Sequence, residues 1–385
     1  ASIVEPSGGV GGIAGELAAD TGTCRPSGAL AELCLEGWLH DGAHSCAPIL
    51  PAEPCPDGFM AVPGDAECRP VMICSEDPWG EIPIDASTVF VLAGSSGDGS
   101  EAQPFGTISQ AIAAAAPGAI VAIGPGVYPE DVLLTKPVRL WGSCTAEVLI
   151  QGNGQIGAVF LREGSDGSEV HDLSITGPEM GIIASGATGL WFDRVHVLDT
   201  GRRGIDVEDP LGPVEALVTR SLFERNLESG WYADGATLVV EKSALRDVGF
   251  NQGIARGVNS QSSAEGKPAN VTVRGSVIER IGDAGMLSWG GHLDVEGSVI
   301  RDITPAPSQE GGLGIDVTSG TLEPVTLRVH SSLIERTFSS GIAARGAYVD
   351  VQATTIRGVA PEQLSGFLGR GMELREDDLN GWVSE

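Results

Sequence analysis

The amino-acid sequence predicts an all-β solenoid, in which short strands wind into a stack of small coils. The first observation is repetition: residues 271–280 (VTVRGSVIER) return 22 positions later as residues 293–302 (LDVEGSVIRD). A repeat of this length is typical of one structural unit stacked on the next. The second is a period-two alternation of apolar and polar residues, as in strands. The third is composition, because 55 glycines and 5% aromatic residues, without long helical apolar patterns, disfavour a multi-helix enzyme.

Two kinds of anchor mark each predicted coil. An apolar residue ends one strand, at Ile175, Val197, Phe223, Leu245, Ile278, Ile300, Ile334 and Ile356. A glycine followed by an apolar residue begins the next strand, at Gly181, Gly204, Gly230, Gly253, Gly285, Gly314, Gly341 and Gly371. The first anchors are 22 to 34 residues apart, and the wider spacings predict loops inserted at residues 258–270 and 304–312. Insertions in solenoids collect on one face, often the functional one.

A column of small hydroxyl residues recurs with the same period, at Ser221, Ser243, Ser276, Ser298, Ser332 and Thr354. Repetition on every coil predicts that these hydroxyls satisfy backbone groups at an inside corner. They are therefore interpreted as structural rather than as nucleophiles.

The first 85 residues predict a separate, irregular module that leans on the start of the main domain, residues 86–385. Six of the seven cysteines crowd into it, and the full set is Cys24, Cys34, Cys46, Cys55, Cys68, Cys74 and Cys144. This clustering favours disulfides formed in an oxidising compartment. Zinc is the alternative, but no C-x-x-C pair is present. Because the number of cysteines is odd, one of them is free or is bridged to another molecule. Separately, residues 29–38 suggest a short helix.

One amphipathic helix is predicted ahead of the train of strands. Thr107 and Gln110 form a T-x-x-Q capping box before the alanine-rich run 111–116, which Pro117 and Gly118 end. Because an uncovered strand edge promotes aggregation, we expect this helix to cap the N-terminal end of the stack.

Three phrases carry a resemblance to a known family. They are residues 103–112 (QPFGTISQAI), 118–130 (GAIVAIGPGVYPE) and 138–142 (VRLWG). With the repeats, they resemble the first coils of the pectin lyase-like superfamily across residues 87–375. This resemblance implies a right-handed, single-stranded parallel β-helix. It implies no single activity, because the superfamily includes lyases, hydrolases, esterases, epimerases and non-catalytic surface proteins.

None of the superfamily's catalytic motifs is intact. Residues 191–195 (WFDRV) match a pectate lyase phrase only in part, because its histidine is missing. Asp206 and Asp316, each in a Gly-Ile-Asp-Val phrase, are similar to polygalacturonase sequences, but the remaining residues of that motif are absent.

The strongest candidate site lies on outward positions of the strands that follow the glycine anchors. One predicted outward column is Ile183, Asp206, Tyr232, Ala255, Leu287, Asp316, Ala343 and Glu373, and a second is Ser185, Glu208, Asp234, Gly257, Trp289, Thr318, Arg345 and Arg375. Because coils stack about 4.8 Å apart, Asp206, Glu208, Tyr232 and Asp234 should form one patch.

The three carboxylates of this patch suggest a calcium site, since calcium prefers several oxygen ligands. They also suggest acid/base chemistry on a sugar stacked on Tyr232. The alternative is a solvated acidic face. We expect Arg202 and Arg203 to form a solvated turn rather than to bind an anionic sugar. We expect His171, His196, His292 and His330 to be surface residues rather than ligands.

The net charge of −29 disfavours nucleic acid as a partner, because nucleic acid is bound through basic patches. No apolar run reaches the roughly 18 residues of a transmembrane helix. A start at Ala1 fits removal of a signal peptide or a sequence that simply begins there. The absence of an evident capping helix after Glu373 suggests an oligomer or partner at the C-terminal end.

We therefore expect a secreted, cell-surface or periplasmic β-helix protein that is carbohydrate-associated or structural, with polysaccharide as the expected partner. One alternative is a polysaccharide lyase or glycoside hydrolase acting on acidic polysaccharide. The other is an adhesin-like scaffold. No cofactor is indicated apart from the suggested calcium.

Overall fold

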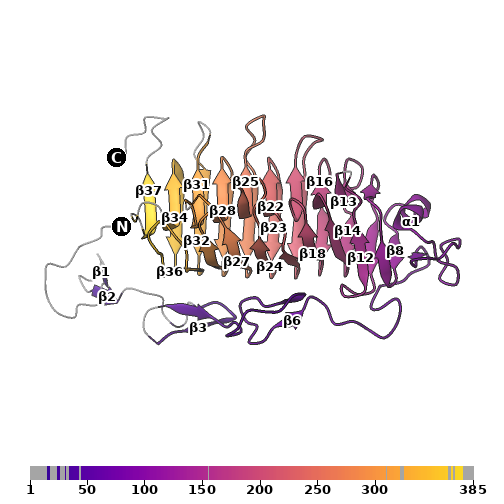
Figure 1. The fold of residues 1–385 in the computed structure, drawn as a ribbon, viewed down its shortest axis with the longest axis horizontal. Coiled ribbons are helices and arrows are strands. Elements are labelled where there is room, and N and C mark those ends of the chain that lie inside the picture. The colour runs from indigo at the N-terminus through magenta and orange to yellow at the C-terminus, as the bar shows by residue number, and fades with distance from the viewer. Residues whose placement is uncertain are drawn as a thin grey trace.

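The computed structural model describes residues 15–17, 24–26, 31, 34–42, 45–154, 156–308, 310–320, 325–362, 366 and 369–375. For residues 15–17 and 24–26, only the backbone is described. The chain forms a long stack of coils, with an extended N-terminal segment running along one side (Figure 1). Within the described residues, no helix is long and apolar enough to cross a membrane.

Within the described residues, three parallel sheets of 10, 11 and 10 strands make up the stack. Sheet 1 contains β10 (Val132–Leu134), β13 (Gly157–Leu161), β16 (Met180–Ala184), β19 (Ile205–Glu208), β22 (Glu228–Asp234), β25 (Ala255–Gln261), β28 (Ala284–Trp289), β31 (Leu313–Thr318), β34 (Ser340–Arg345) and β37 (Arg370–Arg375). Sheet 2 contains β7 (Val89–Val91), β8 (Ile120–Ile123), β11 (Arg139–Gly142), β14 (Glu169–His171), β17 (Leu190–Asp193), β20 (Glu215–Thr219), β23 (Thr237–Glu241), β26 (Asn270–Arg274), β29 (His292–Glu296), β32 (Val325–His330) and β35 (Ala347–Gln352). Sheet 3 contains β9 (Gly126–Tyr128), β12 (Val148–Gln151), β15 (Ser174–Gly177), β18 (His196–Thr200), β21 (Leu222–Glu224), β24 (Ala244–Val248), β27 (Val277–Gly282), β30 (Val299–Thr304), β33 (Leu333–Glu335) and β36 (Thr355–Arg357). From β10 onward each coil contributes one strand to each sheet in turn, which confirms the predicted parallel β-helix.

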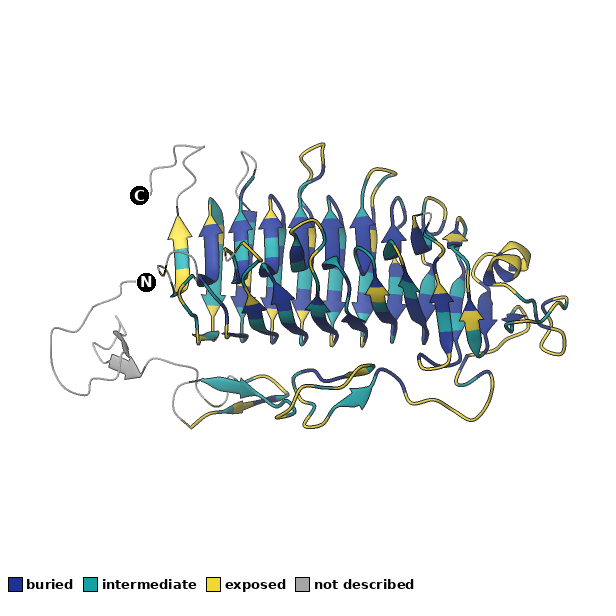
Figure 2. Cartoon of the chain, viewed as in Figure 1, coloured by how far each residue is buried: buried dark blue, intermediate teal, exposed yellow. Residues whose placement is uncertain are grey.

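The predicted apolar anchors form one continuous row inside the stack. Ile175 pairs with Val197, and the pairing continues coil by coil to Ile356. The anchors from Ile175 to Ile334 are fully buried in the core cluster that fills the stack, and Ile356 packs against it. Figure 2 shows this core as dark blue along the strands, with exposed residues mainly in the turns and loops. Burial of these side chains, at about 25 cal/mol per Å² of apolar surface, is the main force that stacks the coils.

The glycine anchors form a second row, with one correction. A methyl group on Gly285 or Gly314 would lie 2.7 or 2.4 Å from the carbonyl oxygen of the next glycine in the row. In the coil between Gly230 and Gly285, however, the row is occupied by Gly257, because Val258 pairs with Trp231 and Met286. The prediction of Gly253 was wrong, since the loop before β25 carries extra residues. Val258 to Gln261 are therefore strand, and the inserted loop begins at Ser262.

The hydroxyl column is confirmed as a backbone-binding ladder. The Ser221 N–H donates to the Ser243 hydroxyl at 3.0 Å, and the Ser243 N–H donates to the Ser276 hydroxyl at 3.1 Å. Equivalent bonds of 3.2 to 3.4 Å continue through Ser298 and Ser332 to Thr354.

Helix α1 (Ile108–Ala114) begins after Thr107, whose hydroxyl accepts the Gln110 N–H at 3.3 Å. Glu130 accepts the N–H groups of Ile108 and Ser109 at 2.7 and 2.9 Å. Ile108 and Ala111 are buried in the main core, at the N-terminal end of the stack. The predicted helix is present, and its capping role remains a prediction.

The part of the N-terminal module that the structure describes contains three antiparallel pairs, β1 (Gly15–Leu17) with β2 (Cys24–Pro26), β3 (Trp38–His40) with β4 (Cys46–Pro48), and β5 (Phe59–Met60) with β6 (Arg69–Pro70). Its disulfides are Cys34–Cys46, Cys55–Cys68 and Cys74–Cys144. The side chain of Cys24 lies outside the described residues. The suggested helix at residues 29–38 lies partly outside the described residues: Ala31 is in a 3₁₀ turn, and residues 34–38 lead through a turn into β3.

Residues 34–42 and 45–74, here called the strap, lie along the outer face of sheet 3. Met60, Val62 and Val71 pack on Leu222 and Ala244. Trp38 and its neighbours pack further along the stack, on Val277, Val299 and Leu333. The strap thus extends well beyond the start of the β-helix, contrary to the expectation, because sheet 3 presents an apolar stripe there.

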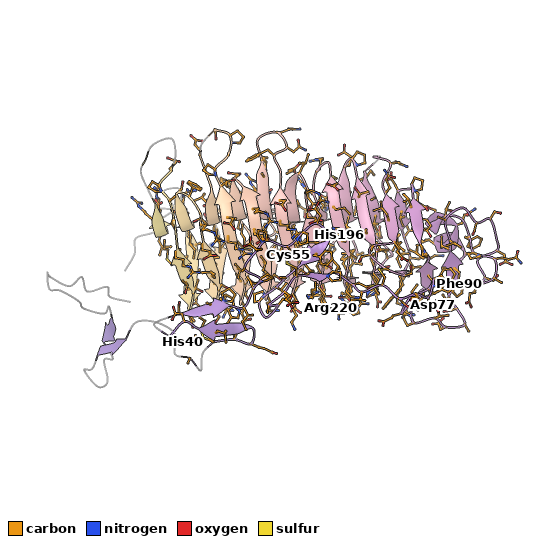
Figure 3. All side chains as sticks on the ribbon, turned by 60° about the horizontal axis from the view of Figure 1, so that its bottom comes forward. His40, Cys55, Asp77, Phe90, His196 and Arg220 are labelled. Atoms are coloured by element: carbon orange, nitrogen blue, oxygen red, sulfur yellow. A yellow bond between two sulfur atoms is a disulfide. The ribbon has the colours of Figure 1, made fainter. Side chains whose placement is uncertain are left out.

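A buried ion pair also clamps the strap. Arg246 forms a salt bridge with Glu224 at 2.5 Å and donates to the backbone oxygens of Cys55 and Pro56 at 2.9 and 2.8 Å. Glu224 also accepts the Gly58 N–H at 3.1 Å. Burial alone would raise the pKa of Glu224, but His196 and Arg246 lower that pKa to about 2. Figure 3 shows Cys55 of the strap beside His196 of sheet 3.

Candidate functional site

The outer face of sheet 1 carries the predicted candidate residues. Its register places Asp206 beside Tyr232 and Glu208 beside Asp234, as predicted. The next strand contributes Asn259 and Gln261 to the two columns. The prediction of Ala255 and Gly257 at these positions was wrong. The extra residues in the loop before β25 shift the register by four residues, as they did for the glycine anchor.

Asp206 is buried, with 2% of its surface exposed. Arg203 donates to its Oδ2 at 2.7 Å, while its Oδ1 is buried without a hydrogen-bond partner. Burial raises the pKa of Asp206 to about 7, although Arg203 acts in the opposite direction. Such a carboxyl group can exchange a proton near neutral pH, yet it has little contact with solvent.

Arg203 is the centre of this cluster, not part of a solvated turn. Its guanidinium lies 3.6 Å from the centroid of the Tyr232 ring and pairs with Glu228 at 2.7 Å. Arg202 also pairs with Glu228, at 3.0 Å. Because Arg203 covers Tyr232, that ring is occupied internally, and the structure does not support a sugar stacked on it.

Glu208 and Asp234 lie half-buried at the edge of the same cluster. Burial raises the pKa of each carboxyl group. The Tyr232 hydroxyl lies 3.3 Å from Asp234 Oδ2 and 3.3 Å from Gln261 Oε1. Among the described residues, no group of three or more histidine, cysteine or acidic side chains is arranged to hold a metal ion, and the suggested calcium site stays a prediction.

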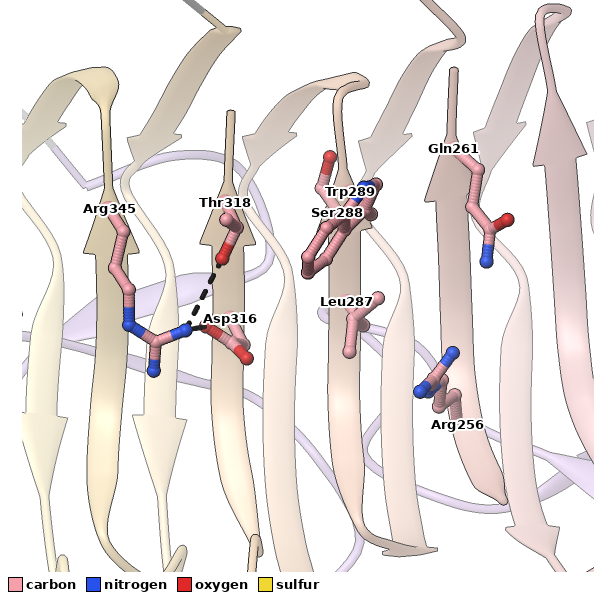
Figure 4. Close-up of a pocket in the computed structure, with 8 residues that line it drawn as sticks. All are labelled: Arg256, Gln261, Leu287, Ser288, Trp289, Asp316, Thr318 and Arg345. Atoms are coloured by element: carbon pink, nitrogen blue, oxygen red, sulfur yellow. Dashed lines mark hydrogen bonds and ion pairs between the residues drawn. The ribbon is translucent and has the colours of Figure 1, made fainter. Parts of the chain in front are cut away.

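A pocket of about 380 Å³ lies further along the same face. Its lining residues are Arg256, Gln261, Leu287, Ser288, Trp289, Asp316, Thr318 and Arg345 (Figure 4). We call it the Trp289 pocket. Trp289 is 55% exposed on β28. Apart from Gln261, which belongs to β25, no residue of the predicted inserts 258–270 and 304–312 lines the pocket. The two inserted loops therefore do not form its walls.

Asp316 is the carboxylate of this pocket. Arg345 pairs with its Oδ1 at 3.9 Å and donates to the Thr318 hydroxyl at 3.4 Å. Asp316 Oδ1 is buried and accepts no hydrogen bond. Burial raises the pKa of Asp316 despite Arg345. On the other side, Arg256 pairs with Asp283 at 3.6 Å.

The sequence alone indicated some of the residues of the Trp289 pocket. Trp289, Asp316, Thr318 and Arg345 stand in the predicted outward columns, but nothing in the sequence marked them above the acidic patch. Arg256 was missed because the register error placed it elsewhere.

Two of the four histidines contradict the expected surface positions. His171 is fully buried, stacked on Trp141 at 4.0 Å and hydrogen-bonded to Glu169 at 2.8 Å. His196 is buried beneath the strap, 3.0 Å from Glu224. His292 and His330 are partly exposed.

The three stacked parallel sheets define the class of the protein: it is a parallel β-helix. A family model described as a protein of unknown function (DUF1565) matches residues 92–280. No curated protein sequence matches the chain.

Several solved structures resemble the chain in fold. Pectate lyase Pel9A is 13% identical with a TM-score of 0.44, covering 73% of this chain and 80% of its own. The mannuronan C-5 epimerase AlgE6 A-module of Azotobacter vinelandii is 16% identical with a TM-score of 0.43, covering 70% and 92%. Pectin methylesterase PemA of Erwinia chrysanthemi is 13% identical with a TM-score of 0.41, covering 56% and 80%. At this level of similarity, function has to be argued from the site itself.

Proposed function

We propose that the protein binds carbohydrate on the outer face of sheet 1, in the Trp289 pocket. The observation that carries this proposal is a large aromatic side chain, Trp289, left 55% exposed in a pocket of otherwise mostly polar groups. A tryptophan ring offers an apolar face against which the C–H groups of a sugar ring can pack. Gln261, Thr318 and Arg345 offer hydrogen-bonding groups for sugar hydroxyls around it. A few polar groups around an apolar surface are typical of small-molecule sites.

The two arginines of the pocket favour a sugar that carries a carboxylate. Guanidinium groups bind carboxylates through charge-assisted hydrogen bonds, and Arg256 and Arg345 both line the pocket. The remaining surface of a protein with net charge −29 repels polyanions, so we expect recognition of short stretches rather than of whole chains.

The second candidate function is a polysaccharide lyase, and Asp316 favours it. A carboxylate with a raised pKa beside a cation is a candidate general base. Glycoside hydrolysis generally uses two carboxyl groups that flank the scissile bond, and Asp316 is the one carboxylate in the described lining of the pocket. Among enzymatic functions, elimination from an acidic sugar therefore fits better than hydrolysis.

The three disulfides support a further part of the proposal, that the protein works outside the cytoplasm. Disulfides persist in secreted, cell-surface and periplasmic proteins. We also infer that α1 caps the first coil, since its apolar face is continuous with the core.

Affinity electrophoresis against a panel of neutral and uronate-containing polysaccharides tests the binding proposal. We expect retardation by at least one acidic glycan, and at least a tenfold weaker affinity for Trp289→Ala, about 1.4 kcal/mol. Tyr348→Ala, which removes a 65% exposed aromatic ring from sheet 2, is the matched control. Equal binding by both variants would refute the site. Ultraviolet absorbance of an unsaturated product, lost in Asp316→Asn, would identify a lyase.

A further inference from the structure

The outer face of sheet 3 carries one continuous stripe of side chains. In register, it runs through Val127, Leu149, Ser174, His196, Leu222, Ala244, Val277, Val299 and Leu333. The strap covers the part from His196 to Leu333. This stripe is therefore a surface that already binds an extended polypeptide.

The N-terminal part of the same stripe is open. Val127 is 52% exposed, and the strap residues beside it, Phe59 and Ile73, are 40% and 84% exposed. Together they line a groove of about 660 Å³, with Leu149 and Leu198 among the other sheet 3 residues. We call it the strap groove. Three large apolar side chains gathered at one groove are unusual for a soluble surface and indicate a binding site.

The groove is bordered by acidic groups. Asp57 of the strap is almost fully exposed, where Arg225 contacts it at 3.2 Å. Glu147, in the turn before β12, lines the opposite part and is also exposed. These charges and the net charge of −29 attract a basic partner and repel an acidic one.

We propose that the strap groove binds an extended polypeptide segment of a partner protein, with apolar side chains alternating with lysine or arginine. Continuity with the strap interface supports a polypeptide, because the strap is held on the same stripe by apolar contacts and by backbone bonds to Arg246 and Glu224. Alternation follows from the strand geometry, which points successive side chains to opposite sides. The basic residues face Asp57 and Glu147.

Fluorescence anisotropy with labelled hexapeptides tests this site. The probes alternate valine, leucine or phenylalanine with lysine, and a matched set replaces lysine by glutamate. We expect the lysine set to bind, the glutamate set to bind at least tenfold more weakly, and the double substitution Ile73→Ser with Val127→Ser to weaken the lysine set at least tenfold. Leu133→Ser with Leu211→Ser, at two other exposed apolar residues that lie outside the groove, should leave binding unchanged.

Because all four substituted residues are at least partly exposed, both double variants should fold, and unfolding curves confirm this independently. Absence of binding by every lysine peptide, equal binding by the glutamate set, or equal loss in both double variants would each overturn the proposal.

Discussion

Replacing Arg246 by methionine is expected to lower the free energy of unfolding by about 3–5 kcal/mol, because it removes the shorter of the two arginine pairs of the buried carboxylate Glu224. Glu224 is fully buried and Arg246 nearly so. Arg246 also donates to two strap carbonyl groups, so the strap should loosen as well. Urea unfolding measures the first effect, and proteolysis within residues 45–74 measures the second.

The pH dependence of this defect follows from the pKa of Glu224. The folded-state pKa is lowered from 4.5 to about 2, so its stabilising contribution is present above about pH 4.5 and is lost as the pH falls toward 2. The defect of Arg246→Met should therefore shrink when unfolding is measured at pH 3 instead of pH 7. Arg274→Met, which removes two exposed ion pairs, with Glu241 and Glu296, is the control and should cost less than about 1 kcal/mol. A similar cost for both variants would refute the clamp.

The second large effect is expected from Gly257→Ala, in the centre of the glycine row. The added methyl group would lie 2.4 Å from the Gly285 carbonyl oxygen and 2.9 Å from Ile278 Cγ2. Neither neighbour can withdraw without opening the stack, so we expect a loss of about 3 kcal/mol or more. Thermal unfolding measures it.

Gly253 is the matched control for this substitution. A methyl group there meets nothing within 4 Å, and only its positive φ of 86° is unfavourable, which costs about 1–2 kcal/mol. If Gly253→Ala were as damaging as Gly257→Ala, the register described for β25 would be wrong.

The contrast between these two glycines explains where sequence reasoning ended. The inward rows could be predicted because stacked coils impose the same requirement at every repeat, as at Ile175, Ile278 and Ser276. Gly253 follows Gly230 by 23 residues, close to the 22-residue period, so an insertion in the turn was mistaken for a regular coil. Inserted loops follow no period, so the spacing between two glycines does not show whether a loop has been inserted between them.

The candidate site was predictable only in part for a related reason. The adjacency of Asp206 and Tyr232 follows from the repeat, and the structure confirms it. The position of Arg203 over Tyr232 depends on how the turn before β19 folds back on the sheet. No sequence pattern predicts the conformation of that turn. The apolar stripe on the outer face of sheet 3, where the strap packs, is visible in the sequence. Leu222, Val277 and Leu333 are apolar at outward positions that are otherwise often polar.

The most direct test of the proposed function is fluorine NMR of the full chain labelled with 5-fluorotryptophan, titrated with the acidic oligosaccharides that the panel selects. The seven tryptophans give separate probes, and Trp289→Phe assigns the Trp289 resonance. We predict a saturable shift of that resonance, while the resonance of Trp231, fully buried in the core, stays in place. A Trp289 resonance that no glycan moves, or that moves only together with Trp231, would contradict carbohydrate binding in the Trp289 pocket.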